Sequence, residues 1–228
     1  MQNVKNTMID TLLSQIAPHP CCSCGKIGAL LCENCKYNII DEVISDCIVC
    51  GGSAGERGIC KDCRTPYQRA WCIGERSGAL RELIDVYKFE YARAAHLSLS
   101  ELLLDRVSQL PADTIVIPIP TVMAHIRERG YDHTLLIARA FAKKRRLSMR
   151  RVLRRATSTR QRGASRDDRI TQAKAAFNVR QKLDPSVPYL IIDDIVTTGA
   201  TVHYAAEALR LAGARDVWIA VIARQPLD

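Results

Sequence analysis

Hydrophobic and polar positions follow two different rhythms along the C-terminal two-thirds of the chain. Three apolar runs, rich in β-branched residues and preceded by proline or glycine, have the pattern of buried strands. Four segments repeat an apolar residue every three or four positions, which is the spacing of an amphipathic helix. Strands alternating with helices predict an open parallel α/β sheet. The predicted strands are 114–119, 189–192 and 217–222, and the predicted helices are two within 80–104, broken near 89–91, then 132–144 and 200–211.

A further amphipathic helix is predicted at the N-terminus, where Pro18 and Pro20 end it. It is short, near neutral and without a basic face, which favours packing on its own protein over membrane attachment. No apolar run approaches the roughly 18 residues of a membrane span, and the first residues lack a signal-peptide pattern. We therefore expect a cytoplasmic protein without stable membrane insertion. The apolar face of this helix consists of Met8, Ile9, Leu12, Leu13 and Ile16.

The composition is that of an ordinary globular protein: of 228 residues, 47% are apolar and 25% are charged. It excludes collagen-like, low-complexity and fully disordered chains. All 10 cysteines lie between Cys21 and Cys72, so the composition changes sharply near residue 72. We therefore predict two domains, a cysteine-rich one over residues 1–70 and an α/β one over residues 71–228.

Eight of the ten cysteines form four Cys-x-x-Cys pairs, in two halves that repeat one another. Four thiolates at this spacing make a closed tetrahedral site, which predicts two structural zinc sites. A disulfide scaffold is the alternative, but it needs an oxidising compartment. The short loops favour consecutive pairing over a cross-braced one, and leave Cys22 and Cys72 as plain small side chains. The predicted ligands are Cys21, Cys24, Cys32 and Cys35 in one site, and Cys47, Cys50, Cys60 and Cys63 in the other.

The segment 189–201 combines a buried strand, two adjacent carboxylates and a loop rich in threonine and glycine that turns into a helix. Ligands of α/β sheets bind at this edge, and a helix N-terminus favours a phosphate. Asp193 and Asp194 beside such a loop suit a sugar and Mg²⁺, so a sugar phosphate is the inferred ligand. The alternative is an acidic loop in which Thr198 or Thr201 merely caps the helix.

This segment resembles, along its whole length, the phosphoribosyl-pyrophosphate (PRPP) signature of type I phosphoribosyltransferases. With the paired cysteines, nearly the whole chain resembles the ComF family of competence-associated proteins and its relatives named for gluconate utilisation. The chain departs from that family at Asp132 and His133, where asparagine and glutamine are usual, and at Gln172, where asparagine is usual. The likeness also covers the amphipathic start, 80–89, 117–120, 129–131, Gln161 with Arg169, and Ala176 with Phe177.

The resemblance implies a role for each motif. Asp193 and Asp194 would hold the 2′ and 3′ hydroxyls of the ribose and are the candidate catalytic residues, with Mg²⁺ accompanying PRPP. The pyrophosphate would face Arg127 and Arg129, together with the loop that follows the first predicted strand. Lys88, between two predicted helices, is a further phosphate candidate, and an exposed lysine is the alternative. The implied 5′-phosphate loop comprises Thr197, Thr198, Gly199, Ala200 and Thr201.

The formal net charge of +9 is concentrated in one stretch. Residues 143–166 contain 11 lysines and arginines and no acidic residue. Such a density of like charge favours contact with polyphosphate or nucleic acid, and a solvated face is the alternative. In a helix, two arginine pairs four positions apart would lie on one side. These candidate DNA-binding residues are Arg150, Arg151, Arg154 and Arg155. The polar segment 161–169 aligns with the loop that closes over the active site of phosphoribosyltransferases. Some arginines of the basic stretch are therefore also candidates for binding pyrophosphate.

Three functional hypotheses follow. The first is a phosphoribosyltransferase-like zinc protein that binds PRPP and single-stranded DNA and acts in DNA uptake for natural transformation, with DNA-uptake, helicase or recombination proteins as partners. The pathway comes from the family resemblance alone. The second is a nucleotide-salvage phosphoribosyltransferase, which would need a base-recognition element that the sequence does not display. The third is a non-catalytic PRPP sensor or single-stranded DNA adaptor.

Overall fold

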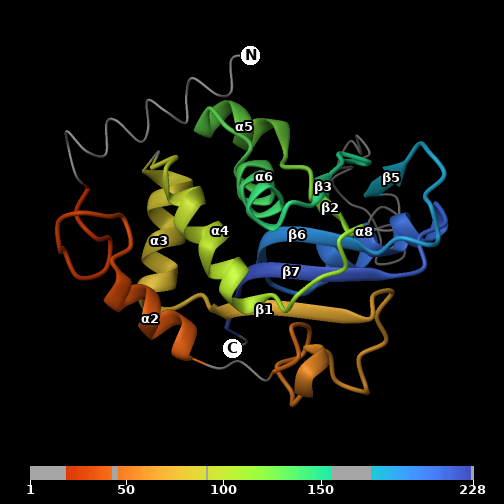
Figure 1. Ribbon diagram of the computed structural model, residues 1–228, viewed down its shortest axis with the longest axis horizontal. Helices are drawn as coiled ribbons and strands as arrows, with labels where there is room; N and C mark the ends of the chain where they lie inside the picture. The colour runs from red at the N-terminus through yellow and green to blue at the C-terminus, as the bar shows by residue number, and fades with distance from the viewer. Residues whose placement is uncertain (1–18, 43–45, 91, 156–175, 227–228) are drawn as a thin grey trace, which may run out of the picture.

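The structure, a computed structural model, describes residues 19–42, 46–90, 92–155 and 176–226. Its centre is a five-stranded sheet with the strand order β1-β7-β6-β2-β3 (Figure 1). Every neighbouring pair is parallel, so the expected α/β class with an open parallel sheet is confirmed. The strands are β1 (Arg69–Glu75), β2 (Ile115–Pro118), β3 (Ser148–Met149), β6 (Tyr189–Val196) and β7 (Val217–Arg224).

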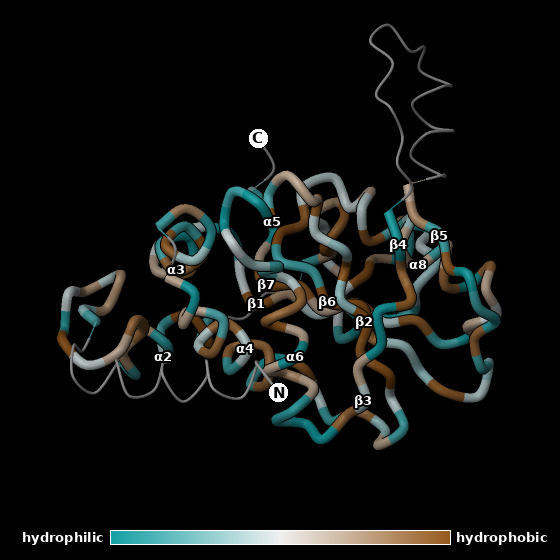
Figure 2. Tube along the Cα trace, turned by 90° about the horizontal axis from the view of Figure 1, so that it is seen from above, coloured by the Kyte–Doolittle hydropathy of each residue, from teal (hydrophilic) through white to brown (hydrophobic). Residues whose placement is uncertain are grey.

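Helices cover both faces of this sheet. On one face the apolar sides of three helices pack against alternate strand residues such as Leu190 and Ile192. On the other face, one helix of the described residues packs against the intervening strand residues, such as Ile191 and Val221. Apolar positions are accordingly concentrated along the central strands (Figure 2). The first face carries α3 (Gly78–Phe89), α4 (Ala95–Arg106) and α6 (His133–Arg145), and the second carries α8 (Ala200–Leu211).

The helices and strands predicted within the described residues are all present, with one extension that matters for the site. β6 continues to Val196, so Asp193 and Asp194 lie inside the strand near its C-terminal end. The apolar pattern missed β1, whose alternation is interrupted by Arg69, Cys72 and Gly74. It also missed β3, α2 (Glu33–Asp41), α5 (Met123–Arg129) and the antiparallel pair of β4 (Leu153–Arg155) with β5 (Phe177–Val179).

The cysteine-rich part packs on the sheet domain with its two halves on opposite faces. Cys21, Leu31 and Ile39 join the core beneath α3 and α4. Cys47 and Ile48 join the core beneath α8. In the four described segments of the chain, no helix has the length and apolarity to cross a membrane. The predicted N-terminal helix, up to Ile16, lies outside the described residues.

Candidate functional site

The two adjacent aspartates of β6 lie at the C-terminal edge of the sheet and are buried, with 6% and 9% of their surfaces exposed for Asp193 and Asp194. Side chains alternate along a strand, so Asp194 faces α3 and α6 while Asp193 faces the α8 side. The Asp193 carboxylate accepts a hydrogen bond from the Asp194 backbone N–H at 2.9 Å. The Asp194 carboxylate accepts one from Ile195 N–H at 2.6 Å. Each carboxylate is therefore held by its own strand.

Asp194 is the centre of a charged cluster contributed by three helices. Its Oδ2 lies 2.5 Å from Lys88 Nζ at the end of α3 and 2.7 Å from His133 Nε2 at the start of α6. Arg129, the last residue of α5, donates from Nη1 to His133 Nδ1 at 3.1 Å. Because an arginine only donates, His133 carries its hydrogen on Nε2, toward Asp194. The Tyr87 hydroxyl holds the backbone of His133 through its carbonyl oxygen at 2.8 Å.

The two carboxylates have opposite electrostatic environments. Burial, followed by the charge of Asp194, raises the pKa of Asp193 to about 8, and the charges of Lys88 and Arg155 only partly oppose that rise. Burial acts in the same direction on Asp194, but the hydrogen bond from His133 and the charge of Lys88 outweigh it and hold the Asp194 pKa below its usual range. Burial therefore favours the protonated form of Asp193, whereas the groups around Asp194 favour its ionised form.

The loop after β6 presents backbone and hydroxyl donors to solvent. Gly199 precedes α8 with φ +74°, a left-handed conformation that favours glycine. No side chain caps the first turn of α8, apart from a long contact of 3.5 Å in which Ala200 N–H approaches Thr198 Oγ1. The side chains around this turn are exposed, so its N–H groups are accessible to an anion. The exposed residues are Thr197, Thr198, Ala200 and Thr201.

A basic groove of about 650 Å³ lies next to this edge, between Pro120, α5 and the β4–β5 pair. Arg155 crosses it, donating from Nε to the Pro120 carbonyl at 2.7 Å, and its guanidinium lies 5.0 Å from the ring centre of Phe177. Asp132, on the opposite side, accepts from Thr121 at 2.8 Å and lies 3.8 Å from Arg151. The cationic residues of the groove are Arg151, Arg154, Arg155 and Arg180.

The helical arrangement considered for the four candidate DNA-binding arginines is wrong. Arg150 follows β3, and its N–H bonds to the Val116 carbonyl at 3.0 Å, while Arg154 and Arg155 belong to β4. The extended backbone places Arg151, Arg154 and Arg155 around the groove. Part of the basic stretch, and the polar segment 161–169, lie outside the described residues.

The other predicted phosphate contacts divide into two groups. Lys88 and Arg129 both belong to the Asp194 cluster, and the Lys88 side chain is only 12% exposed, which rules out the alternative of an exposed lysine. Arg127 lies on the exposed side of α5. From the sequence, His133 was assigned no functional role. Its departure from the family pattern, next to Asp132, was the available signal that this position is distinctive.

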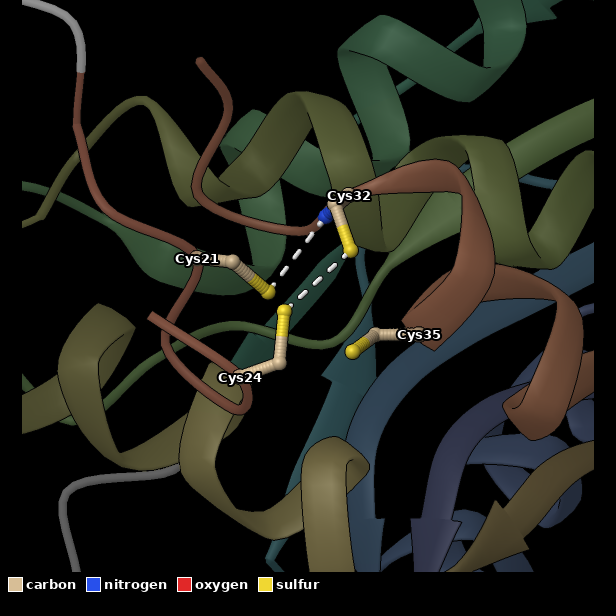
Figure 3. Close-up of side chains that lie close together, drawn as sticks. All are labelled: Cys21, Cys24, Cys32 and Cys35. Atoms are coloured by element: carbon tan, nitrogen blue, oxygen red, sulfur yellow. Dashed lines mark hydrogen bonds between the residues drawn. The ribbon is translucent and has the colours of Figure 1, made fainter. Parts of the chain in front are cut away.

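Both four-cysteine groups are assembled as consecutive pairing predicts, and the cross-braced alternative is not observed. The four sulfur atoms of each group lie within 4.8 Å of one another. In the first group, Cys24 Sγ and Cys32 Sγ are 3.5 Å apart, and the Cys32 N–H points at Cys21 Sγ at 3.4 Å (Figure 3). In the second, the Sγ atoms of Cys50 and Cys60 are 3.6 Å apart.

These dimensions and donors fit zinc. A tetrahedron of ~2.3 Å Zn–S bonds places its sulfurs roughly 3.8 Å apart. Although burial opposes it, backbone N–H groups lower the pKa of Cys21 to about 6 and that of Cys47 to about 7, which favours the thiolate at one ligand of each group. Burial and the neighbouring thiols raise the pKa of Cys35 and of Cys63, so these ligands need the charge of a bound cation to ionise. Cys72 lies outside both groups, donates to the Gly74 carbonyl at 3.2 Å, and has its pKa raised by burial to about 11. Cys22 also lies outside both groups.

The fold and site define an α/β protein with an open parallel sheet, a buried acidic pair and an exposed helix N-terminus at the sheet edge, and two four-cysteine groups. No known family profile matches the chain. It is 26% identical over 213 residues to "Competence protein F" of Haemophilus influenzae, covering 85% of this chain and 90% of that protein. It is 21% identical over 190 residues to "Competence protein ComFC" of Bacillus subtilis, covering 78% and 77%. These relatives confirm the resemblance to the ComF family.

Among solved structures, the chain has a TM-score of 0.40 and 17% identity to one entitled "Structure of the allosteric regulatory enzyme of purine biosynthesis", covering 55% of this chain and 25% of that one.

Proposed function

We propose that this chain is a competence-related, phosphoribosyltransferase-like zinc protein that binds PRPP with Mg²⁺ at the C-terminal edge of β6. The observation that carries the proposal is the order of donors and acceptors along one strand end. Buried Asp193 and Asp194 are followed immediately by the exposed first turn of α8. Carboxylates accept hydrogen bonds from vicinal hydroxyls, and the helix N-terminus attracts a phosphate. A ribose 5-phosphate group carries both vicinal hydroxyls and a phosphate, the two functions that these acceptors and donors suit.

The charge distribution supports a ligand with phosphates at both ends. Asp194 is already neutralised by Lys88, so a ribose hydroxyl and Lys88 would share its carboxylate. The basic groove beside Pro120 would receive the pyrophosphate. Arg155 links this groove to the aspartates, because its charge lowers the pKa of Asp193. When bound, Mg²⁺ supplies the neutralisation of the pyrophosphate oxygens. The residues of this chain position the ribose and hold its hydroxyls.

We further propose that single-stranded DNA contacts the exposed arginines around the same groove. Arg151 and Arg154 are exposed at its rim, and Arg150 is exposed next to it. Arg155 is exposed as well, but its guanidinium is held by the Pro120 carbonyl and the Phe177 ring, and it would serve PRPP instead. The printed names of the two competence relatives support a role in DNA uptake. Four-thiolate zinc sites need a reducing compartment, which supports a cytoplasmic location.

The test is a calorimetric titration of the protein with PRPP and Mg²⁺, and of its Asp193→Asn/Asp194→Asn variant. The substitutions keep size but remove both carboxylates, so we expect affinity to fall at least about tenfold, or 1.4 kcal/mol. Asp113→Asn, at an exposed position away from the site, should leave affinity unchanged. Unaltered affinity in the double variant would refute the assignment of the ligand.

The same preparation separates the DNA hypothesis from nucleotide salvage. A salvage enzyme would release pyrophosphate with some nitrogenous base and show no meaningful affinity for single-stranded DNA. The proposed function predicts DNA affinity at low salt. A parent protein without that affinity would contradict the DNA part of the proposal and leave the PRPP part to stand on its own titration.

A further inference from the structure

The second four-cysteine group lies directly against the proposed phosphate loop. Val49 stands between two of its ligands, in the Cys47-x-x-Cys50 turn. A Cβ atom placed on Gly199 would lie 3.6 Å and 3.7 Å from the two methyl carbons of Val49. These are van der Waals contact distances. The Val49 side chain of the cysteine turn therefore lies beside Gly199, the glycine that precedes α8, and both residues line the same pocket.

The same turn is fastened to the edge of the sheet by Arg224, the last residue of β7. Arg224 is 5% exposed, and its Nη2 lies 2.5 Å from Glu75 Oε1 and 3.5 Å from Asp46 Oδ2. Its Nη1 also approaches the Cys47 carbonyl oxygen at 3.4 Å. Both neighbours, Asp46 and Cys47, belong to the start of the cysteine turn. The turn is thus held at the strand ends that carry the candidate site.

A pocket of about 290 Å³ separates the remaining surfaces of the cysteine module and the loop. Arg64, which follows the last cysteine ligand, supplies a cation to its wall. Tyr67 also lines it, is 3% exposed, and has a hydroxyl without a hydrogen-bond partner among the described residues. The loop side is formed by Thr198, Gly199 and Ala200 with His203 and Tyr204.

The first four-cysteine group has no such position. It packs on the opposite face of the sheet through Leu31 and Ile39, and Lys36 of α2 pairs with Asp105 of α4 at 3.1 Å. Ser23, which occupies in its first turn the place that Val49 occupies in the second group, is exposed. The two groups repeat in sequence, but only the second contacts the phosphate loop.

We propose that the second four-cysteine group is a positioning element for the phosphate loop, so that metal held by Cys47, Cys50, Cys60 and Cys63 sets the affinity for the 5′-phosphate. The inference rests on the proposed PRPP function. Without four ligands drawn to one ion, the Cys47-x-x-Cys50 turn loses the constraint that keeps Val49 on Gly199. The first turn of α8 would then adopt several arrangements, and its N–H groups would converge less well on a phosphate.

The direct test compares Val49→Ala with the matched control Ser23→Ala. Neither change touches a cysteine, so both variants should keep the zinc content of the parent protein. Calorimetry with PRPP-Mg²⁺ and with ribose 5-phosphate, which lacks the pyrophosphate, should show about fivefold weaker binding of both ligands for Val49→Ala only. Equal affinities of Val49→Ala and the parent, or an equal loss in both variants, would overturn the inference.

A reciprocal measurement uses zinc instead of the sugar. Binding free energies are coupled in both directions, so PRPP should raise the retention of zinc by the second group. Zinc loss to a chelator can be followed with a zinc-sensitive dye. In the parent protein, saturating PRPP should reduce zinc loss from one of the two groups about fivefold. In Val49→Ala the reduction should be smaller. Equal zinc loss with and without PRPP would contradict the coupling. A parent that binds no PRPP would overturn the proposed function and this inference with it.

Discussion

Asp193 offers a sharp test of the electrostatics of the site, because its burial should make stability depend on pH in an unusual direction. Burial raises the pKa of Asp193 to about 8, whereas an unburied aspartate has a pKa of 3.8. Between these pH values the folded state binds a proton that the unfolded chain releases, so stability falls as pH rises. Asparagine cannot ionise, so Asp193→Asn should remove this dependence.

The magnitude follows from the two pKa values. At 1.36 kcal/mol per pH unit, the destabilisation from Asp193 grows by at most about 4 kcal/mol between pH 5 and pH 9. Lys88 and Arg155 lie close enough to stabilise its anion, and water can reach the open edge of the sheet. We therefore expect a measured difference of roughly 2 kcal/mol, in a background where a domain's total stability is about 5–15 kcal/mol.

The assay is urea unfolding of the parent and of Asp193→Asn at pH 5 and at pH 9. The variant should gain stability over the parent, and the gain should be larger at pH 9. Other titrating groups, the cysteine thiols included, cancel in the comparison at each pH. The exposed Asp113→Asn variant provides the control and should show no gain. A gain that is the same at both pH values, or absent, would refute the assignment of the proton to Asp193.

Two further predictions concern metal and DNA. Elemental analysis should find about two zinc ions per chain, and strong chelation should expose the N-terminal part to protease. The control variant Cys72→Ala should keep both ions, because Cys72 lies outside both four-cysteine groups. A metal-free preparation of equal protease resistance would be inconsistent with structural zinc. Replacing Arg150, Arg151 and Arg154 by alanine should lower the slope of log affinity against log salt for single-stranded DNA by up to about 2, at roughly 0.7 per phosphate. An unchanged slope would discard this location for the DNA surface.

Local patterns in the sequence predicted the elements whose apolar residues repeat regularly. The run from Tyr189 and the helix from Ala200 were predicted because strand and helix each bury one continuous set of residues. The cysteine pairing was also readable, since ligand spacing within short loops restricts which thiolates can meet. β1 was missed because it carries Cys72 and Gly74 at buried positions, where pairing with β7 rather than its own pattern specifies the strand.

The parts of the site that sequence could not supply depend on contacts between distant segments. Lys88, His133 and Asp194 lie on α3, α6 and β6, and only the packing of these helices on one sheet face joins them. The contact of Val49 with Gly199 joins residues of the two predicted domains. Two pairs of arginines spaced by four resembled a helical repeat, because this spacing suits a helix locally. The second pair belongs to β4, whose extended conformation depends on pairing with β5, a segment distant in the sequence.

The pairing of β1 with β7 has a consequence for the order of events during synthesis. β1 follows the cysteine-rich part directly, yet its hydrogen-bonding partner lies near the other end of the chain, with Arg69 opposite Trp218 and Glu75 opposite Arg224. Contacts of such long sequence separation form late. The cysteine-rich part therefore leaves the ribosome well before the sheet edge that receives it exists, and its local loops can bind zinc while β1 is still unpaired. An unpaired strand is open to wrong pairing, so early zinc uptake would shorten the period in which the nascent chain is vulnerable to aggregation.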